Sequence, residues 1–371
     1  MGLPHCTQDD VIQEEVYNQL FFASGKLMIQ DHLSTTIAQE IKARASQVTA
    51  AIRLLDEGAT VPFIARYRKE VTQGLDDTQL RHIAERLHYL RELNDRRDVV
   101  LKTIKEQKKL TPELEQAILS ADTKTRLEDL YLPYRPKRRT KALIAKEAGL
   151  EPLAIALWED STLEPSTFAE SFVNAELKID TPQIALEGAQ QILMERFSED
   201  ADLLSELRTY LWEHCVLKST AAKNKKPAAA KFSDYFNYAE PIKKIPSHRA
   251  LALFRGRRES ALQFELTLPH DPSYGEQRLL TYFKITNPNE WMLETLRLCW
   301  STKLFGKLEL ELLTRLRELA DEEAIRVFTS NLRDLLLAAP AGAHVTMGLD
   351  PGIRTGVKVV VVDASGKLLD Y

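Results

Sequence analysis

The sequence is poor in cysteine and glycine, and these shortages exclude several kinds of protein. Its 371 residues include three cysteines, Cys6, Cys215 and Cys299, which lie far apart and are odd in number. Because no Cys-x-x-Cys pair or Cys/His quartet occurs, neither a zinc site nor a disulfide framework is expected. Glycine is also scarce, with 14 residues, while strong helix formers are abundant. This composition predicts a mainly α-helical protein with reduced thiols.

No secretory signal, membrane-length apolar run or strong charge imbalance is visible either. The one early apolar stretch, residues 20–29, is interrupted by Ser24, Gly25 and Lys26 and follows acidic residues. A secretory signal instead places basic residues before an unbroken apolar segment, and a membrane span is longer. We therefore expect a cytoplasmic protein without a membrane partner. The formal net charge of −4 is too small to indicate a binding partner, so a partner has to be inferred from local clusters of charged residues.

Residues 37–90 have the spacing of three helices separated by turns. Apolar residues recur at helical intervals up to Gly58, which is expected to end the first helix. A proline suits the first turn of the second helix, because its missing N–H would have no partner there. Asp76 followed by Gln79 resembles a capping box, which predicts a third helix over residues 77–108.

Most of the remaining chain is also predicted to be helical. Further helices are expected at residues 141–158, 183–197, 200–218 and through most of 275–338. Asp321 is expected to cap the last long helix. Residues 219–231 are small and basic and predict an exposed connector, and residues 261–268 predict a strand. In the third helix, Asn94 and Arg97 interrupt the apolar stripe, which predicts a solvated or bent stretch.

The two ends of the chain differ from the helical region between residues 34 and 340. Residues 1–33 read as an atypical N-terminal extension with at most a weak helix around residues 11–22. Residues 341–371 contain three β-branched or apolar runs, which predict three strands, and Gly352 permits a tight first turn. Because a new fold begins so close to the last residue, we expect the chain to be the front part of a longer protein.

Residues 48–74 form the first of three candidate binding segments, a helix-turn-helix-like element. Its exposed basic side chains are expected to contact nucleic-acid phosphates, as such helix pairs do when they enter a groove. These side chains are Arg53, Arg66, Arg68 and Lys69. The alternative is an ordinary corner between two helices, in which the arginines pair with Glu57, Glu70 and Asp76.

Two further clusters combine several cations with aromatic residues or glycine. The second cluster holds five cations in seven positions, beside two tyrosines that are candidates for base stacking. Its residues are Arg135, Lys137, Arg138, Arg139 and Lys141, with Tyr131 and Tyr134. The third cluster is Arg255, Arg257 and Arg258 around Gly256. The alternative for both is a solvated surface, or ion pairs with acids of the same chain.

Catalytic signatures are not convincing in this sequence. It contains no phosphate-binding glycine-rich loop, His-Glu-x-x-His or Gly-x-Ser-x-Gly motif. Asp350 ends the first predicted terminal strand, where metal-dependent phosphodiester chemistry would need it as one of several carboxylates. An Asp-Pro-Gly turn also explains it and is the favoured interpretation, because the partner carboxylates are missing from this sequence. We therefore expect no enzymatic activity, metal, cofactor or small-molecule substrate for this chain.

Several long motifs, in order, resemble the bacterial Tex family of transcription accessory proteins. The resemblance covers residues 33–371 and rests on "LLDEGATVPFIARYRKEVTQGLDDTQLR", "LEDLYLPYRPKRRTKALIAKEAGLEPLA", "DYFNYAEPIKKIPSHRALALFRGRRES", "AIRVFTSNLRDLLLAAP" and "GLDPGIRTGVKVVVVDASGKLLD". It implies a helical N-terminal region with a helix-turn-helix-like element. Residues 341–371 would then be the first strands of a YqgF domain of RNase H-like fold, with Asp350 at its first acidic position.

The resemblance also implies a function, namely sequence-tolerant binding of RNA or DNA during transcription. RNA is the expected partner of the full-length protein, together with transcription machinery. Two alternatives remain: a metal-dependent nuclease of the RNase H or RuvC type in the longer parent, and a scaffold that binds proteins of the transcription machinery. The nuclease needs at least two further carboxylates beyond Asp350, whereas the scaffold needs none.

Overall fold

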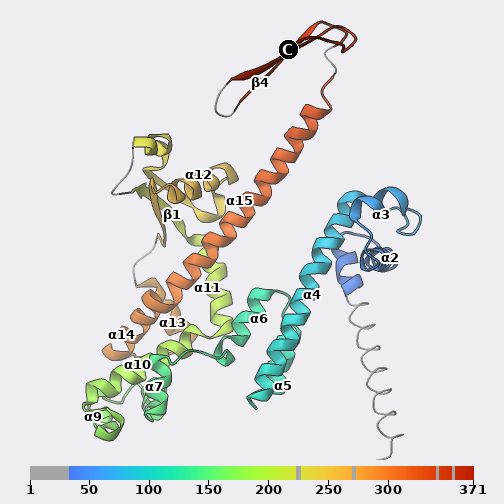
Figure 1. The fold of residues 1–371 in the computed structure, drawn as a ribbon. Helices are drawn as coiled ribbons and strands as arrows, with labels where there is room; N and C mark the ends of the chain where they lie inside the picture. Colours follow the sequence, from blue (N-terminus) through green and yellow to red (C-terminus); the bar gives the residue numbers. More distant parts are fainter. Residues whose placement is uncertain (1–32, 223–226, 270–272, 340–341, 353–355) are drawn as a thin grey trace, which may run out of the picture. The chain divides into compact units, whose positions relative to one another are not determined.

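The protein is mainly α-helical and contains two small antiparallel sheets (Figure 1). The computed structural model describes residues 33–222, 227–269, 273–339, 342–352 and 356–371. They fall into two compact units. The N-terminal unit contains the described residues up to Thr140 together with Glu199–Asp202, and the C-terminal unit contains the others. The weak helix expected around residues 11–22 lies outside the described residues, as does nearly all of the expected N-terminal extension.

After a helical segment over residues 33–40, the three helices that the sequence predicts follow in the N-terminal unit. They are α2 (Ala45–Asp56), α3 (Val61–Tyr67) and α4 (Asp77–Glu106). The predicted capping box at the start of α4 is confirmed. The Gln79 N–H donates to Oδ1 of Asp76 (2.7 Å), and the Asp76 N–H donates to Oε1 of Gln79 (3.1 Å). Gly58 follows α2 with a φ of +87°, a conformation that glycine adopts without strain.

A single apolar core holds this unit together. Two short helices, α5 (Pro112–Leu119) and α6 (Lys124–Tyr131), complete it. Fully or almost fully buried side chains come from every helix: Ile37, Val48, Ile52, Ile64, Leu80, Ile83, Leu87, Leu93, Ile104, Ile118 and Leu127. Since α4 contributes to the core along nearly its whole length, it serves as the spine against which the shorter helices pack.

Arg97 corrects one prediction for α4, because its side chain is not simply solvated but is bound to the protein. The Arg97 side chain reaches the end of α5, where its guanidinium donates to the carbonyl oxygens of Ile118 (3.1 Å) and Ala121 (2.8 Å). It also donates to Oδ1 of Asn94. Burial lowers the pKa of Arg97 below its usual value. Arg97 therefore binds carbonyl groups at the end of α5, and Asn94 accepts a hydrogen bond that helps to hold the Arg97 side chain in place.

Helices also form most of the C-terminal unit, with α10 (Pro182–Ser198) packed against its neighbours α7 (Lys141–Glu147), α8 (Glu151–Glu159), α9 (Pro165–Ala169) and α14 (Glu290–Cys299). The helix predicted over residues 141–158 is thus two helices. Gly149 lies between them with a φ of +79°, which interrupts the helical path.

The first sheet was largely missed by the sequence analysis. Helix α11 (Ala201–His214) ends before residue 218, and β1 (Val216–Ala221) follows at once, so the predicted connector begins later than residue 219. Its residues 223–226 lie outside the described part. Strand β1 is central in the order β2-β1-β3, between β2 (Asn237–Pro241) and β3 (Leu262–Thr267). Only β3 was predicted. The other two strands are short and lack a clear alternation of apolar and polar residues. In addition, β1 follows α11 almost directly, so its residues read in the sequence as a continuation of the helical pattern.

Helix α12 (Ser247–Arg258) covers this sheet through a close approach at Gly256. A Cβ atom at this position would lie 2.4 Å from Cδ1 of Leu262, which is itself buried. Glycine is therefore required for α12 to pack this closely on β3. The contact turns the neighbouring arginines of α12 toward solvent.

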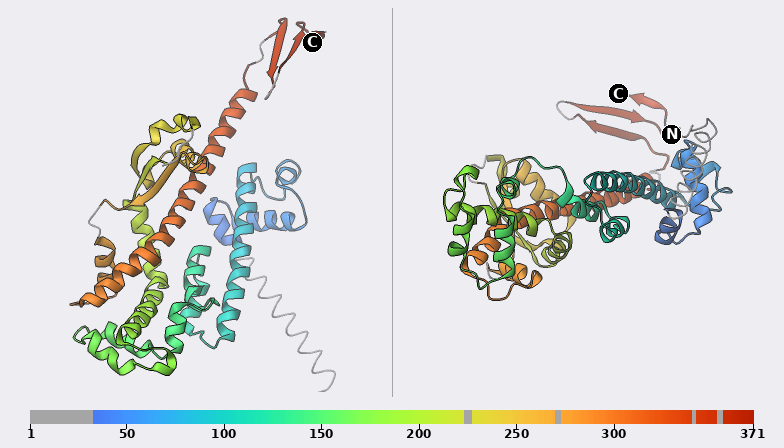
Figure 2. Two further views of the ribbon diagram at one scale, coloured as in Figure 1. Left: turned by 60° about the vertical axis from the view of Figure 1, so that its left-hand side comes forward. Right: turned by 90° about the horizontal axis from the view of Figure 1, so that it is seen from below.

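The last helices agree with the prediction except at Asp321. Helix α13 (Tyr274–Tyr282) and α14 are followed by a π-helical segment (Trp300–Leu304) and by α15 (Phe305–Leu336), which is continuous (Figure 2). Asp321 lies inside α15 and caps nothing. Its carboxylate instead lies 3.7 Å from the guanidinium of Arg317, one turn earlier. A helix former before and after Asp321 lets the helix run through it.

The three terminal strands are found where the sequence predicts them. Antiparallel β4 (Thr346–Pro351), β5 (Val357–Val362) and β6 (Leu368–Asp370) form a sheet in that order. The assignment of this sheet to an RNase H-like domain remains a prediction. Among the described residues, no helix is both long and apolar enough to cross a membrane.

Candidate nucleic-acid interface

The first basic cluster surrounds the end of α3 and is exposed. Ile64 is fully buried and fixes α3 on the core, so that Arg66, Arg68 and Lys69 project from the surface. The Arg68 guanidinium lies 5.4 Å from the centroid of the Phe63 ring and donates to the carbonyl oxygen of Tyr67. Three exposed cations thus lie at the end of α3, with Arg66 in its last turn and Arg68 and Lys69 directly after it.

The alternative reading, a corner in which acids neutralise these cations, holds only in part. Arg53 pairs with Glu57 on α2 at 3.0 Å. Asp76, however, is used by its own helix cap. Within the described ranges, Arg66 and Lys69 form no ion pair. Three of the four predicted contacts of this segment, Arg66, Arg68 and Lys69, therefore carry charge that no carboxylate among the described residues offsets.

The second cluster begins after α6, and its tyrosines are partly used by the core. The Tyr131 ring is 6% exposed, and the Arg96 guanidinium lies 5.2 Å from its centroid, so Tyr131 is not available for base stacking as the sequence suggested. Tyr134 is half-buried against the same core. Its carbonyl oxygen accepts a hydrogen bond from Gln107 at the end of α4 (2.8 Å). This bond fixes the start of the basic segment.

The cations of the second cluster divide into paired and unpaired side chains. Lys137 forms an ion pair with Glu199 of the same unit. Arg135 and Arg138 are exposed and make no ion pair in the part of the chain that the structure describes. Arg139 is also exposed, and Lys141 is the exposed first residue of α7. The segment therefore resembles the α3 cluster in combining neutralised and available charge.

The arginines of α4 provide a contrast inside the same unit. Each of the five is engaged, four with carboxylates and Arg97 with carbonyl oxygens. The four pairs are Arg81–Asp77, Arg86–Glu40, Arg91–Asp56 and Arg96–Glu128. The pKa values of Arg81, Arg91 and Arg96 are raised by hydrogen bonds to these carboxylates. Among the described residues of this unit, Arg66, Arg68, Arg135 and Arg138 differ from the arginines of α4 in that they form no ion pair and lie on α3 or in the segments after α3 and α6.

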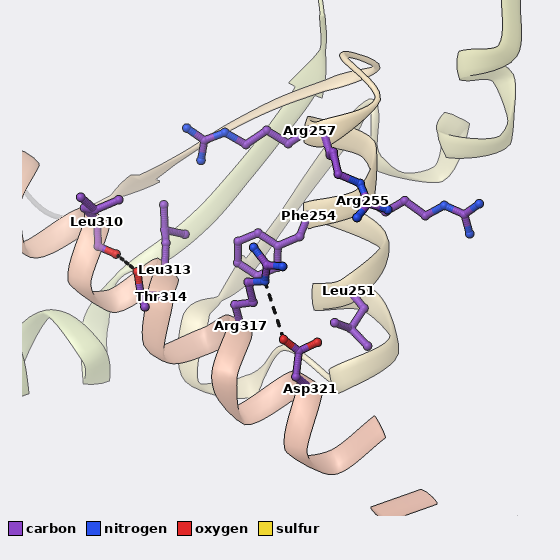
Figure 3. Close-up of a pocket in the computed structure, with 10 residues that line it drawn as sticks. Leu251, Phe254, Arg255, Arg257, Leu310, Leu313, Thr314, Arg317 and Asp321 are labelled. Atoms are coloured by element: carbon purple, nitrogen blue, oxygen red, sulfur yellow. Dashed lines mark hydrogen bonds and ion pairs between the residues drawn. The ribbon is translucent and has the colours of Figure 1, made fainter. Parts of the chain in front are cut away.

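The third cluster lies at the end of α12 in the C-terminal unit. Arg255 pairs with Glu259 at 3.0 Å, and the Arg257 guanidinium lies 4.8 Å from the centroid of the Phe264 ring. Arg258 is exposed and forms no ion pair with any described residue. The structure adds Arg317 of α15 to this cluster (Figure 3). Sequence analysis missed Arg317, because no local pattern joins residues so far apart in the chain.

Asp350 lies on the edge strand β4, opposite Lys358 of β5. Its carboxylate is exposed, and Oδ2 lies 3.5 Å from Nζ of Lys358. No group of three or more histidine, cysteine or acidic side chains that could hold a metal ion occurs among the described residues. Asp350 therefore has a lysine as its neighbour rather than the carboxylates that a two-metal site needs.

Comparison with known proteins places these clusters in a family context. The family model described as "Tex-like protein N-terminal domain" matches residues 31–105, and the one described as "Tex central region-like" matches residues 160–328. The chain is 52% identical over 345 residues to the "Transcriptional accessory protein Tex" of Neisseria gonorrhoeae. The chain belongs to the Tex family. The resemblance inferred from the motifs is thereby confirmed.

Relatives of this Tex protein occur in distant organisms. "Protein YhgF" of Escherichia coli is 53% identical over 352 residues, which are 92% of this chain and 46% of the relative. The gonococcal protein is covered to 45% and this chain to 91%. The human "S1 RNA-binding domain-containing protein 1" is 29% identical over 339 residues, 86% of this chain and 33% of that protein. The chain thus spans about half the length of its bacterial relatives.

Proposed function

We propose that this chain binds RNA or DNA through the phosphate backbone, tolerant of sequence, as part of a transcription accessory protein. One observation carries the proposal. Arg66, Lys69, Arg135 and Arg138 are exposed without an ion pair among the described residues, whereas every arginine of α4 is engaged. Exposed, unpaired cations are what a polyanion neutralises, and each contact releases counterions. The names of the gonococcal and human relatives support the proposal.

The two clusters of the N-terminal unit are associated with opposite ends of α4. The α3 cluster precedes the first turn of α4, and the second cluster is bonded to Gln107 just after its last turn. A helix of 30 residues is roughly 45 Å long at 1.5 Å per residue. We infer that one nucleic acid touching both clusters must extend along this distance, and that α3, the second helix of the helix-turn-helix-like element, forms one end of the site.

The test is a binding titration with a fluorescein-labelled oligouridylate of about 20 nucleotides at several salt concentrations. Each phosphate contact that is removed should lower the slope of log K against log salt by about 0.7 for a single strand. The double variants Arg66→Glu/Lys69→Glu and Arg135→Glu/Arg138→Glu should therefore weaken binding and flatten the slope. A charge-matched control is Arg81→Glu/Arg326→Glu, which alters two exposed arginines that already pair with acids.

The control should bind nearly as the unmodified chain does. Salt-independent binding, or equal binding by all variants, would remove the proposal. We also propose that the chain acts without catalysis. Mg²⁺-dependent cleavage of the oligonucleotide that disappears in Asp350→Asn would contradict that part.

A further inference from the structure

A groove rimmed by arginines lies between α12 and α15 in the C-terminal unit (Figure 3). Its volume is about 670 Å³. Four arginines and one carboxylate line it: Arg255, Arg257, Arg258, Arg317 and Asp321. Two of these arginines form an ion pair: Arg255 pairs with Glu259, and Arg317 pairs with Asp321. The remaining two, Arg257 and Arg258, form no ion pair with described residues, so the groove has an excess of positive charge.

The walls of this groove are mostly aliphatic. Leu251 and Phe254 line it from α12, and Leu310 and Leu313 line it from α15 (Figure 3). Leu313 is buried, but Leu310 at the edge is 69% exposed. Such a site suits a ligand that brings apolar side chains and negative charge together.

The apolar wall continues beyond the groove along the same face of α15. Four apolar side chains follow Asp321 at helical spacing and are 41–72% exposed: Ile325, Phe328, Leu332 and Leu335. Residues three or four apart share one face of a helix, so Leu310, Arg317 and Asp321 fall on the same line as these four. We call these four side chains the α15 stripe. Large exposed apolar patches of this kind mark interaction sites.

We propose that the groove and the α15 stripe together bind an acidic amphipathic helix of a partner protein. The apolar face of that helix would lie along the stripe, and carboxylates at one end would pair with Arg257 and Arg258. Arginine binds carboxylates with two parallel hydrogen bonds, which fixes the register of the bound helix. Apolar contacts at helical spacing are the usual recognition mode of a helix by an apolar surface.

A nucleic acid fits this surface less well. Nucleobases stack on open aromatic faces, whereas Phe254 packs edge-on against Phe264 with 5.5 Å between ring centroids. The α15 stripe itself contains no cation. Arg326 and Arg333 each follow a member of the stripe by one residue, and one residue of a helix is a rotation of about 100°, so both arginines lie on another side of α15. Phosphates would therefore find no partner along the roughly three turns of α15 that the stripe occupies. The proposal is independent of the nucleic-acid binding assigned to the N-terminal unit.

The probe is a fluorescein-labelled 21-residue helical peptide with leucines along one face and glutamates flanking one end of that face. A scrambled peptide of the same composition is the reference. With the full chain, the ordered peptide should bind and the scrambled one should not. Phe328→Asp/Leu332→Asp and Arg257→Glu/Arg258→Glu should each weaken binding by at least about tenfold, as truncations of central contacts do.

Controls separate this result from unfolding or loss of charge. Leu319→Asp alters an exposed leucine on the opposite face of α15 and should leave peptide binding unchanged. Arg81→Glu/Arg326→Glu changes net charge equally and should also have no effect. A peptide with lysines in place of glutamates should bind the Arg257→Glu/Arg258→Glu variant better than the unmodified chain.

Three outcomes would overturn the proposal. The first is equal binding of ordered and scrambled peptides, or variants without effect. The second is loss of oligouridylate binding in Arg257→Glu/Arg258→Glu with unchanged peptide binding, which would assign the groove to nucleic acid. The third is a dimer in light scattering that Phe328→Asp/Leu332→Asp abolishes, which would assign the stripe to a second copy. None of these results depends on whether Arg66, Lys69, Arg135 and Arg138 bind RNA.

Discussion

The two long helices, α4 and α15, have similar lengths and similar apolar patterns but opposite surroundings. Helix α4 buries its stripe from Leu80 to Ile104. Helix α15 buries an apolar stripe only from Leu308 to Ala320, and a second apolar line on another face of the helix is exposed from Ile325 onward. The comparison teaches that helical periodicity identifies an apolar face but does not tell what covers it. Shorter helices cover α4 within its own unit, whereas the second half of α15 has no such neighbours among the described residues.

The largest expected effect comes from matched isoleucines on the two helices. Ile83→Ala on α4 should lower the free energy of unfolding by about 2–5 kcal/mol, because a fully buried side chain leaves a cavity. Ile325→Ala on α15 should change it by less than about 0.5 kcal/mol, because that side chain is 66% exposed. Urea unfolding followed by circular dichroism measures both. Equal losses would mean that the distal half of α15 is covered in solution.

Arg97 tests how α4 supports its neighbours. Arg97→Met should cost about 1–3 kcal/mol, since the carbonyl oxygens of Ile118 and Ala121 lose their donors while partly buried. Arg91→Met is the control, because its pair with Asp56 is well exposed and should be worth no more than about 1 kcal/mol. The same unfolding assay applies. If the two variants were equally stable, the bonds to α5 would contribute nothing.

Substitutions of Asp76 and Asp321 test which of these two aspartates caps a helix. Asp76→Ala should destabilise the N-terminal unit by about 1 kcal/mol, because it removes the capping box of α4. Asp321→Ala should cost less than about 0.5 kcal/mol, because Asp321 lies within α15 and makes only an exposed pair with Arg317. Chemical denaturation distinguishes them. A larger loss for Asp321→Ala would indicate that α15 is two helices with a cap between them.

A change of opposite sign is expected at Gly306 in the first turn of α15. A Cβ atom there would meet no heavy atom within 4 Å. Gly306→Ala should therefore stabilise the protein by up to about 1 kcal/mol, because alanine loses less conformational freedom in a helix. A thermal melt would measure the shift. Destabilisation would mean that the start of α15 does not have the helical conformation described.

Much of the fold could be predicted where local rules act alone. The cap at Asp76, the end of α2 at Gly58 and the three terminal strands depend on residues close together in sequence. Strand β1 could not be predicted, because its pairing with β2 and β3 is decided by distant residues. Asp321 failed as a cap for the related reason that good helix formers continue on both sides of it.

The candidate sites divide in the same way. Clusters of basic residues are visible in the sequence, but which of them are neutralised is not. Arg53 and Lys137 meet acids, whereas Arg66 and Arg138 meet none among the described residues. The predicted contacts to nucleic acid remain predictions for all thirteen residues of the three clusters, namely Arg53, Arg66, Arg68, Lys69, Tyr134, Arg135, Lys137, Arg138, Arg139, Lys141, Arg255, Arg257 and Arg258.

The sequence by itself determined the helical character, the cap at the start of α4 and the family of this protein, because propensity, capping and motif order are local properties of the chain. Only the tertiary structure decided which charges are free and which apolar faces are covered. Ion pairs such as Arg91–Asp56 and the groove between α12 and α15 join residues far apart in sequence. Their energies arise from proximity in space, which no local pattern encodes.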